Sequence, residues 1–214
     1  MTMAEKKART ASPITPLLAE RFSTRAFDPD RPVLFGALLS LFEAARWAPS
    51  SFNDQPWRFI FWNRFYDREG WQKAFDCLTP GNRQWARNAQ ILVATVARDH
   101  FSHDRSPNRW GGHDTGMATM ALLVEAQAQG LAAHVMGGFD PERLRGEFGI
   151  PGDFHPMTMI AIGYAGSPAL LEPDLAAREA GERTREPLDR ILFEGAWAQP
   201  VRDRQSPPLG PVRE

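Results

Sequence analysis

The sequence predicts a single α+β domain in which a central sheet is covered by helices. Amphipathic helical segments alternate with a few short β-branched or aromatic segments, and neither an internal repeat nor a linker divides the 214 residues. A chain of this length buries roughly 70% of its unfolded surface, so it needs no disulfide or structural metal to fold. We therefore expect one domain over residues 13–197, after a flexible tail (1–12) and before a C-terminal extension (198–214).

The elements of the first half follow from apolar spacing and from proline. Pro13 opens a short helix, and Pro49 ends a longer one whose apolar residues recur at helical intervals. Aromatic and β-branched runs predict two strands. The expected helices cover 14–20, 33–47 and 67–78, the strands 57–62 and 91–97, the loop 49–56 and the turn 79–82.

The second half predicts the same alternation. A loop is expected over 102–112, followed by a helix that Asp114 caps and Gly130 ends. Asp140 is expected to cap a further helix. The expected helices cover 114–129, 141–148 and 175–180, and the strands cover 132–136 and 157–164.

Composition and charge exclude several classes of protein. The formal net charge of −1 argues against nucleic-acid binding, and we expect no nucleic-acid partner. No apolar segment is long enough to span a membrane, and the polar N-terminus lacks the apolar region of a secretory signal, so we expect a soluble cytoplasmic protein. Cys77 is the only cysteine and is expected to be buried packing rather than a nucleophile.

The segment Arg21-Phe22-Ser23-Thr24-Arg25 alternates basic and hydroxyl side chains. In an extended segment, residues two apart share a face, so Arg21, Ser23 and Arg25 could converge on one ligand. Two guanidiniums and a hydroxyl suit a phosphate or an electron-rich ring edge. The alternative is a solvated surface strand.

The segment Pro49-Ser50-Ser51-Phe52-Asn53-Asp54-Gln55-Pro56 places hydroxyls and two side-chain amides between prolines, directly before Trp57. Rigid donors and acceptors at close range are what the edge of a heteroaromatic ring requires. The alternative interpretation is an ordinary turn.

Together, the segments 48–57 and 21–25 resemble the nitroreductase family of flavoenzymes, and the resemblance extends from about Pro13 to Trp197. It implies a mainly antiparallel central sheet, an intertwined homodimer and one FMN at each subunit interface. It also implies that Asn82 hydrogen-bonds the ring, although Asn82 could equally cap a helix. The implied cofactor-binding residues are Arg21, Phe22, Ser23, Arg25, Pro49, Ser50, Ser51, Asn53, Gln55, Asn82, Gly137, Gly138, Arg183 and Arg185.

The resemblance further assigns parts of the site to separate tasks. Arg183 and Arg185 would grip the phosphate, and the Gly137-Gly138 turn would face flavin N5. Some relatives carry a lysine where this chain has Trp85, so Arg25 would supply more of the charge that stabilises the reduced ring.

The resemblance implies a ping-pong cycle without a catalytic side chain. NADPH or NADH passes hydride to flavin N5, and an electron-poor small molecule, such as a nitroaromatic or a quinone, then accepts it. Two alternatives remain open. One is a relative that reduces another acceptor (an enal, a semialdehyde or a halogenated aromatic), and the other is a flavin-binding or sensing protein without turnover.

Other site types lack support in the sequence. There is no GxGxxG, GxxxxGK[ST] or GxSxG motif. A metal site is not expected, because the candidate ligands lack a recognised spacing. These candidates are His100, His103, Asp104, His113 and Asp114.

Overall fold

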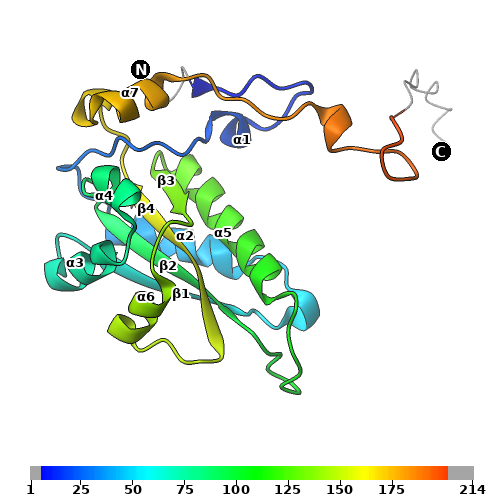
Figure 1. Cartoon of the computed structure of the whole chain (residues 1–214), viewed down its shortest axis with the longest axis horizontal. Helices are drawn as coiled ribbons and strands as arrows, with labels where there is room; N and C mark the ends of the chain where they lie inside the picture. Colours follow the sequence, from blue (N-terminus) through cyan, green and yellow to red (C-terminus); the bar gives the residue numbers. More distant parts are fainter. Residues whose placement is uncertain (1–5, 202–214) are drawn as a thin grey trace, which may run out of the picture.

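A computed structural model describes residues 6–201 and contains a four-stranded sheet with every neighbouring pair of strands antiparallel (Figure 1). The strand order is β1-β2-β4-β3. The predicted α+β class with a mainly antiparallel sheet is confirmed. The strands are β1 (Trp57–Asn63), β2 (Ile91–Arg98), β3 (Ala132–Met136) and β4 (Phe154–Gly163).

Helices cover both faces of the sheet. Strand β2 lies between β1 and β4, and its residues are buried from Ile91 to Ala97. Successive side chains of a strand point to opposite faces. Accordingly, Leu92 and Ala94 pack in one apolar cluster with Trp71 and Trp85, whereas Ile91 and Val93 belong to a second cluster. This burial on both faces explains why β2 reads as a continuous apolar run.

The helices follow the predicted order. Asp140 caps α6 by accepting hydrogen bonds from the amides of Glu142 and Arg143, as expected, and Gly130 follows α5 with a φ of 69°. The α-helices are α1 (Pro16–Glu20), α2 (Phe35–Arg46), α3 (Arg68–Asp76), α4 (Pro80–Ala86), α5 (Gly111–Ala128), α6 (Pro141–Phe148) and α7 (Pro173–Ala180), and the 3₁₀ turns are η2 (Ser51–Asn53), η3 (Pro168–Leu170) and η4 (Leu188–Arg190).

Three sequence predictions about helix starts are wrong. Residues 79–82 are not a turn: Pro80 opens α4, a position where proline costs no hydrogen bond, and Thr79 is the N-cap, so Asn82 lies inside the helix. Asp114 does not cap α5, which begins at Gly111. Only glycine fits there, because a Cβ would lie 2.5 Å from the Arg98 carbonyl oxygen. Helix α1 begins at Pro16 rather than near Pro13.

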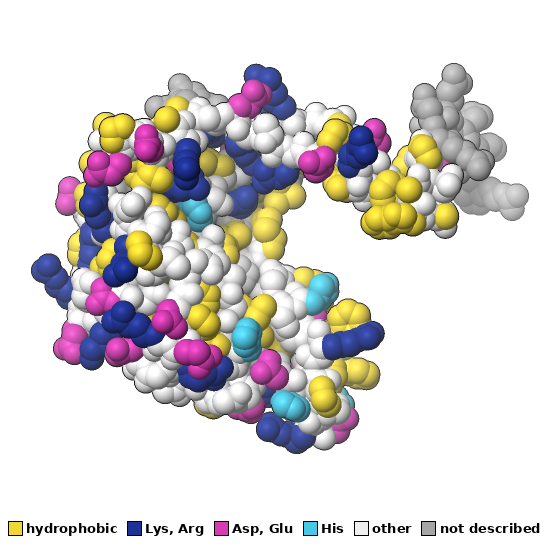
Figure 2. All heavy atoms as spheres, viewed as in Figure 1, with side chains coloured by type: hydrophobic (Ala, Val, Ile, Leu, Met, Phe, Trp, Pro, Cys, Tyr) yellow, Lys and Arg dark blue, Asp and Glu magenta, His cyan; other side chains and the backbone are white. Residues whose placement is uncertain are grey.

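The two terminal segments pack against each other. Residues 181–201, here called the strap, follow α7 and run away from the sheet at their C-terminal end (Figure 1). The Lys6 ammonium donates to the carbonyl of Gly181, and Arg9 pairs with Glu182 at 2.7 Å. Figure 2 shows a deep hollow between the strap and the rest of the molecule.

Two further sequence expectations can be compared with the structure. No helix between residues 6 and 201 is long and apolar enough to cross a membrane.

Cys77 is buried in the first apolar cluster, and burial raises the pKa of its thiol to about 11. The thiol is therefore protonated at neutral pH, which agrees with a packing role.

Candidate functional site

The end of α1 and the start of the strap form a cleft of about 210 Å³, here called the arginine cleft. Arg21 ends α1, and the next residues continue without regular structure toward β3. Lys and Arg side chains gather in the hollow beneath the strap (Figure 2). The cleft brings together six of the predicted cofactor residues: Arg21, Phe22, Ser23, Arg25, Arg183 and Arg185.

The arginine cleft is rich in positive charge, although Glu179 and Glu182 also line it. Burial lowers the pKa of Arg21, and the nearby charge of Arg185 lowers it further. Burial lowers the pKa of Arg183 as well, and the charges of Arg21 and Arg185 add to the effect. Within residues 6–201, none of these arginines, nor Arg25, forms an ion pair with a carboxylate. Such a cluster favours an anion.

Arg183 also has a structural task that the sequence did not reveal. Its Nη1 donates to the carbonyls of Lys6 at 2.8 Å and Ala19 at 2.7 Å, which ties the strap to the N-terminal segment. Arg185 Nη1 donates to the neighbouring carbonyl of Thr184. Neither Arg21 nor Arg25 forms a side-chain hydrogen bond to any residue between 6 and 201, so these two cleft arginines are the most available to a ligand.

Within residues 21–25, Thr24 and Ser23 have different surroundings. Thr24 is buried, and its hydroxyl donates to the carboxylate of Glu179 on α7, while Ser23 is exposed. The other carboxylate oxygen of Glu179 accepts the Arg25 amide at 3.1 Å. Glu179 is therefore a buried anchor between α7 and the basic segment, and no sequence pattern pointed to it.

Trp85, at the position where some relatives carry a lysine, lies in the apolar core. It is buried, and its ring stacks on His134 with a centroid distance of 4.4 Å. His134 Nδ1 donates to the carbonyl of Thr24 at 2.9 Å. Burial lowers the pKa of His134 to about 4, the Thr24 hydrogen bond opposes the shift, and the charges of Arg25 and Arg21 add to it. His134 is therefore neutral at pH 7, and it lies directly behind the basic segment.

The Gly137-Gly138 turn after β3 packs against the start of α4. The carbonyl of Gly138 accepts hydrogen bonds from the Thr79 amide at 3.0 Å and from the Asn82 side-chain nitrogen at 2.9 Å. The predicted residues Asn82 and Gly138 are thus in contact, but this nitrogen of Asn82 is already engaged. A Cβ on Gly137 would meet no atom within 4 Å, so a planar ring could approach the backbone there.

Gly138→Ala is expected to disrupt this turn. The added Cβ would lie 2.7 Å from Thr79 Oγ1 and 2.8 Å from Asn82 Nδ2. Overpacking of this kind costs about 1–3 kcal/mol of unfolding free energy. Urea denaturation measures the loss. Gly137→Ala, where space is open, is the control, and equal stability of the two variants would contradict the packing described.

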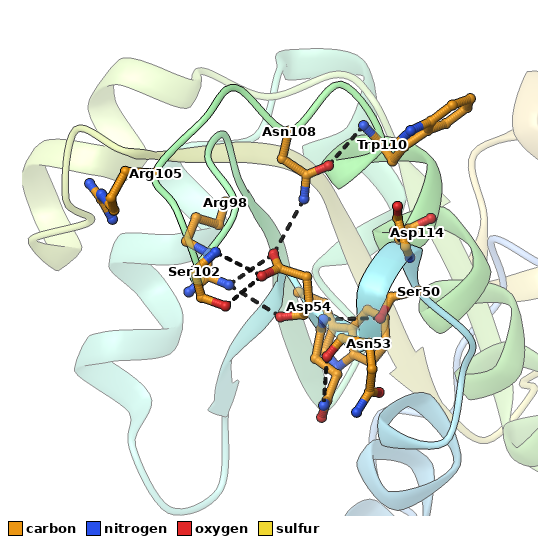
Figure 3. Close-up of polar contacts among 12 residues, drawn as sticks. Ser50, Asn53, Asp54, Arg98, Ser102, Arg105, Asn108, Trp110 and Asp114 are labelled. Carbon is orange, nitrogen blue, oxygen red and sulfur yellow. Dashed lines mark hydrogen bonds and ion pairs between the residues drawn. The ribbon is translucent and has the colours of Figure 1, made fainter.

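The Pro49–Gln55 loop lies beside the first turn of α5 (Figure 3). Ser50 Oγ accepts the Gln55 amide at 3.0 Å, and the Gln55 side-chain nitrogen donates to the Asn53 carbonyl at 3.1 Å. Phe52, Asn53 and Gln55 have φ values of 54°, 54° and 49°. Left-handed backbone at three non-glycine residues is costly, and such strain clusters at functional sites.

Two buried carboxylates hold this loop, and the sequence identified neither. Asp54 pairs with Arg98 at 2.9 Å and also accepts hydrogen bonds from Ser102 and Asn108 (Figure 3). Asp114 Oδ2 accepts the Ser51 amide at 2.9 Å. Although burial raises the pKa of Asp54, the hydrogen bonds from Ser102 and the pairing with Arg98 outweigh it and lower the pKa to about 2.

This ionised carboxylate predicts a dependence of stability on pH. The folded pKa of about 2 lies below the usual value of about 3.9 for an unfolded aspartate. The contribution of Asp54 is therefore complete above pH about 4 and is lost as the pH falls toward 2. Urea denaturation from pH 5 to pH 2 should show the difference between wild type and Asp54→Asn shrinking across this window. A constant difference would contradict the ionised pair.

The arginine cleft and the Pro49–Gln55 loop do not meet within one chain. The loop contacts the first turn of α5 through Ser51 and Asp114, whereas α1 lies beyond the other half of that helix (Figure 1). Among residues 6–201, no group of three or more His, Cys, Asp or Glu side chains could hold a metal ion.

The Nitroreductase family matches residues 18–164. This match spans more than half of the chain, so the chain belongs to the nitroreductase family, and the predicted oxidoreductase class is confirmed.

Two curated relatives and two solved structures are similar to this chain. A Streptomyces coelicolor protein, provisionally named NADH dehydrogenase/NAD(P)H nitroreductase, is 30% identical over 161 residues (65% of this chain, 78% of the relative). An uncharacterised 15.4 kDa Mycolicibacterium smegmatis protein is 34% identical over 124 residues (58% and 82%). A solved structure described as an oxidoreductase containing FMN has a TM-score of 0.83 and 36% identity (90% and 96%). A Desulfovibrio desulfuricans nitroreductase-type protein in complex with FMN shares the fold, with a TM-score of 0.68 and 22% identity (86% and 99%).

Proposed function

We propose that this protein is an FMN-dependent oxidoreductase that transfers hydride from NAD(P)H to an electron-poor small molecule such as a nitroaromatic or a quinone. The observation that carries the proposal is the arginine cleft, in which Arg21, Arg25, Arg183 and Arg185 lie together and form no ion pair with a carboxylate among the described residues. The relatives add support, because one is named for NAD(P)H nitroreductase activity and two solved structures are described with FMN.

The residues present fit FMN. Arg21 and Ser23 would hold the phosphate, assisted by Arg185 and by the guanidinium nitrogens of Arg183 that do not anchor the strap. About three charge-assisted hydrogen bonds of roughly 1.5–3 kcal/mol each, together with ring burial, are enough for micromolar affinity. Bound FMN would supply a ring that takes up and gives away hydride at N5.

The polypeptide's own task would be to orient the ring and to place positive charge where negative charge develops. Asn53 and Gln55 would present their amides to the ring edge, and the open backbone at Gly137 would allow a close approach. Arg25 would supply the charge, because Trp85 is buried in the core and His134 is neutral.

A second copy of the chain would complete the site. Because the loop and the arginine cleft are separated in one chain, we infer a homodimer in which one subunit's loop faces the partner's cleft. The hollow beneath the strap contains a groove of about 710 Å³, which is lined by apolar residues of the N-terminal segment, α1, α5 and the strap, and also by Arg21, Arg183 and Arg185 of the arginine cleft. Exposed apolar patches of this kind mark interaction surfaces. These residues include Ile14, Leu18, Met120, Leu188 and Ile191.

Anaerobic mixing of the FMN-loaded protein with NADPH, and separately with NADH, tests the proposal. Loss of the visible flavin absorbance, followed by its return when a nitroaromatic or a quinone is added, is the expected result. Return only with an enal, a semialdehyde or a halogenated aromatic would identify a differently specialised relative. A flavin that keeps its absorbance with both nicotinamides would refute the enzymatic proposal and favour a flavin-binding protein.

A further inference from the structure

The Pro49–Gln55 loop holds an unfavourable backbone conformation. Phe52 and Asn53 precede Asp54 with left-handed φ values, and Gln55 follows it with another. None of the three is glycine, and Phe52 is bulky and 82% exposed, with its ring centroid 5.7 Å from that of Phe101 and 5.5 Å from that of His103. The surrounding contacts must therefore hold the backbone in place.

Those contacts converge on two carboxylates. The Asp54 side chain is 1% exposed, and its oxygens accept hydrogen bonds from Arg98 Nη2 at 2.9 Å, the Ser102 amide at 2.8 Å and Asn108 Nδ2 at 3.3 Å. Arg98 Nη2 also donates to the Asp54 carbonyl at 3.1 Å, so the guanidinium clasps both side chain and backbone. Figure 3 shows these groups pointing toward one another from β2 and the loop that follows it.

The second carboxylate holds the other end of the loop. Asp114 lies in the first turn of α5, its side chain is 3% exposed, and it accepts the Ser51 amide at 2.9 Å. Its other oxygen contacts His113 Nδ1 at 2.9 Å. Two of the residues with left-handed φ, Phe52 and Asn53, therefore lie between Ser51, which is fixed to α5, and Asp54, which is fixed to β2, and Gln55 follows Asp54 directly.

We propose that Asp54 and Asp114 are positioning residues of the flavin site, which hold the backbone of Ser51–Gln55 so that Asn53 and Gln55 present their amides to the ring edge. Burial keeps both carboxylates away from any ligand, so each acts through the loop. The inference rests on the proposed function, because it assumes that this loop meets a flavin.

Asp54→Asn is the primary test, since it removes the charge with little change in shape. Amide hydrogen exchange over residues 51–55 should become faster in the variant without flavin, while exchange in α6 stays unchanged. With flavin, kcat/KM should fall on the order of 100-fold, as expected when a positioning group is lost. FMN and riboflavin should both bind more weakly by a similar factor, because only contacts to the ring are disturbed. Asp104→Asn is the matched control. This exposed aspartate lies after β2, in the same loop as Ser102, and it accepts hydrogen bonds from the amide and the hydroxyl of Ser106. It forms no hydrogen bond with residues 51–55.

Ser102→Ala and Asp114→Asn keep the proposal testable if Asp54→Asn does not fold. Ser102→Ala removes one hydrogen bond to Asp54 and leaves its charge in place. Faster exchange over residues 51–55 and weaker binding of both flavins would support the proposal. The proposal would be overturned if a folded Asp54→Asn variant showed the same amide exchange and the same flavin affinity as the wild type. The same result in both Ser102→Ala and Asp114→Asn would also overturn it. If the wild type itself binds no flavin, the proposed function fails, and exchange alone still decides whether the carboxylates hold the loop.

Discussion

Replacing Arg21 with alanine is expected to weaken FMN binding about 10- to 100-fold while leaving riboflavin binding nearly unchanged. Arg21 lies in the arginine cleft, and the described chain gives it neither an ion pair nor a side-chain hydrogen bond. One charge-assisted hydrogen bond to a phosphate contributes about 1.5–3 kcal/mol, which corresponds to this range. Riboflavin lacks the phosphate, so its affinity should not depend on Arg21. Fluorescence titration of the apoprotein with each flavin measures both affinities.

Two further variants make this measurement specific. Arg21→Lys keeps the charge but loses the planar fork, so it should retain part of the affinity. Arg87→Ala is the control, because Arg87 lies outside the cleft and pairs with Glu172 at 3.5 Å. Equal losses for FMN and riboflavin in Arg21→Ala would contradict a phosphate site at Arg21.

The double variant Leu188→Glu/Ile191→Glu is expected to be monomeric and to lose FMN. The two side chains lie in η4 and just after it, are 47% and 65% exposed, and line the groove beneath the strap. Burying a fully exposed large apolar side chain contributes roughly 1.5–3 kcal/mol. Because these two are about half exposed in one chain, two of them in each subunit account for about 3–7 kcal/mol of association free energy. Analytical ultracentrifugation at micromolar concentration measures the assembly.

The control for this variant is Tyr66→Glu, another exposed large side chain that lies in the turn between β1 and α3, outside the groove. It should leave assembly and FMN content unchanged. A double variant that remains dimeric would show that the strap groove is not the interface. A monomeric double variant that keeps full FMN affinity would show that the flavin site lies within one chain.

Elements specified by local chemistry could be predicted from the sequence. Strand β3 and helix α6 have the predicted boundaries, because Asp140 and Pro141 start the helix through capping and a preset φ. The starts of α4 and α5 were missed because proline and glycine are also residues of turns. At Gly111, the close carbonyl of Arg98 comes from a distant strand, which no local pattern reveals.

In the candidate site too, features set by the local sequence could be predicted, whereas contacts between distant residues could not. The alternation of Arg21, Ser23 and Arg25 follows from extended-backbone geometry, whereas their meeting with Arg183 and Arg185 was expected only from the family resemblance. The Asp54–Arg98 pair joins positions 44 residues apart, and the Glu179 contact with Arg25 joins positions 154 apart. Such contacts of buried carboxylates with residues far away in the sequence depend on tertiary packing, so no local sequence pattern indicates them.

The visible absorption spectrum of the purified protein, before and after incubation with FMN and removal of the free cofactor, tests the central claim most directly. The proposal predicts a retained flavin spectrum, with FMN identified by its phosphate after release from the protein. A protein that stays colourless after incubation with FMN would contradict it.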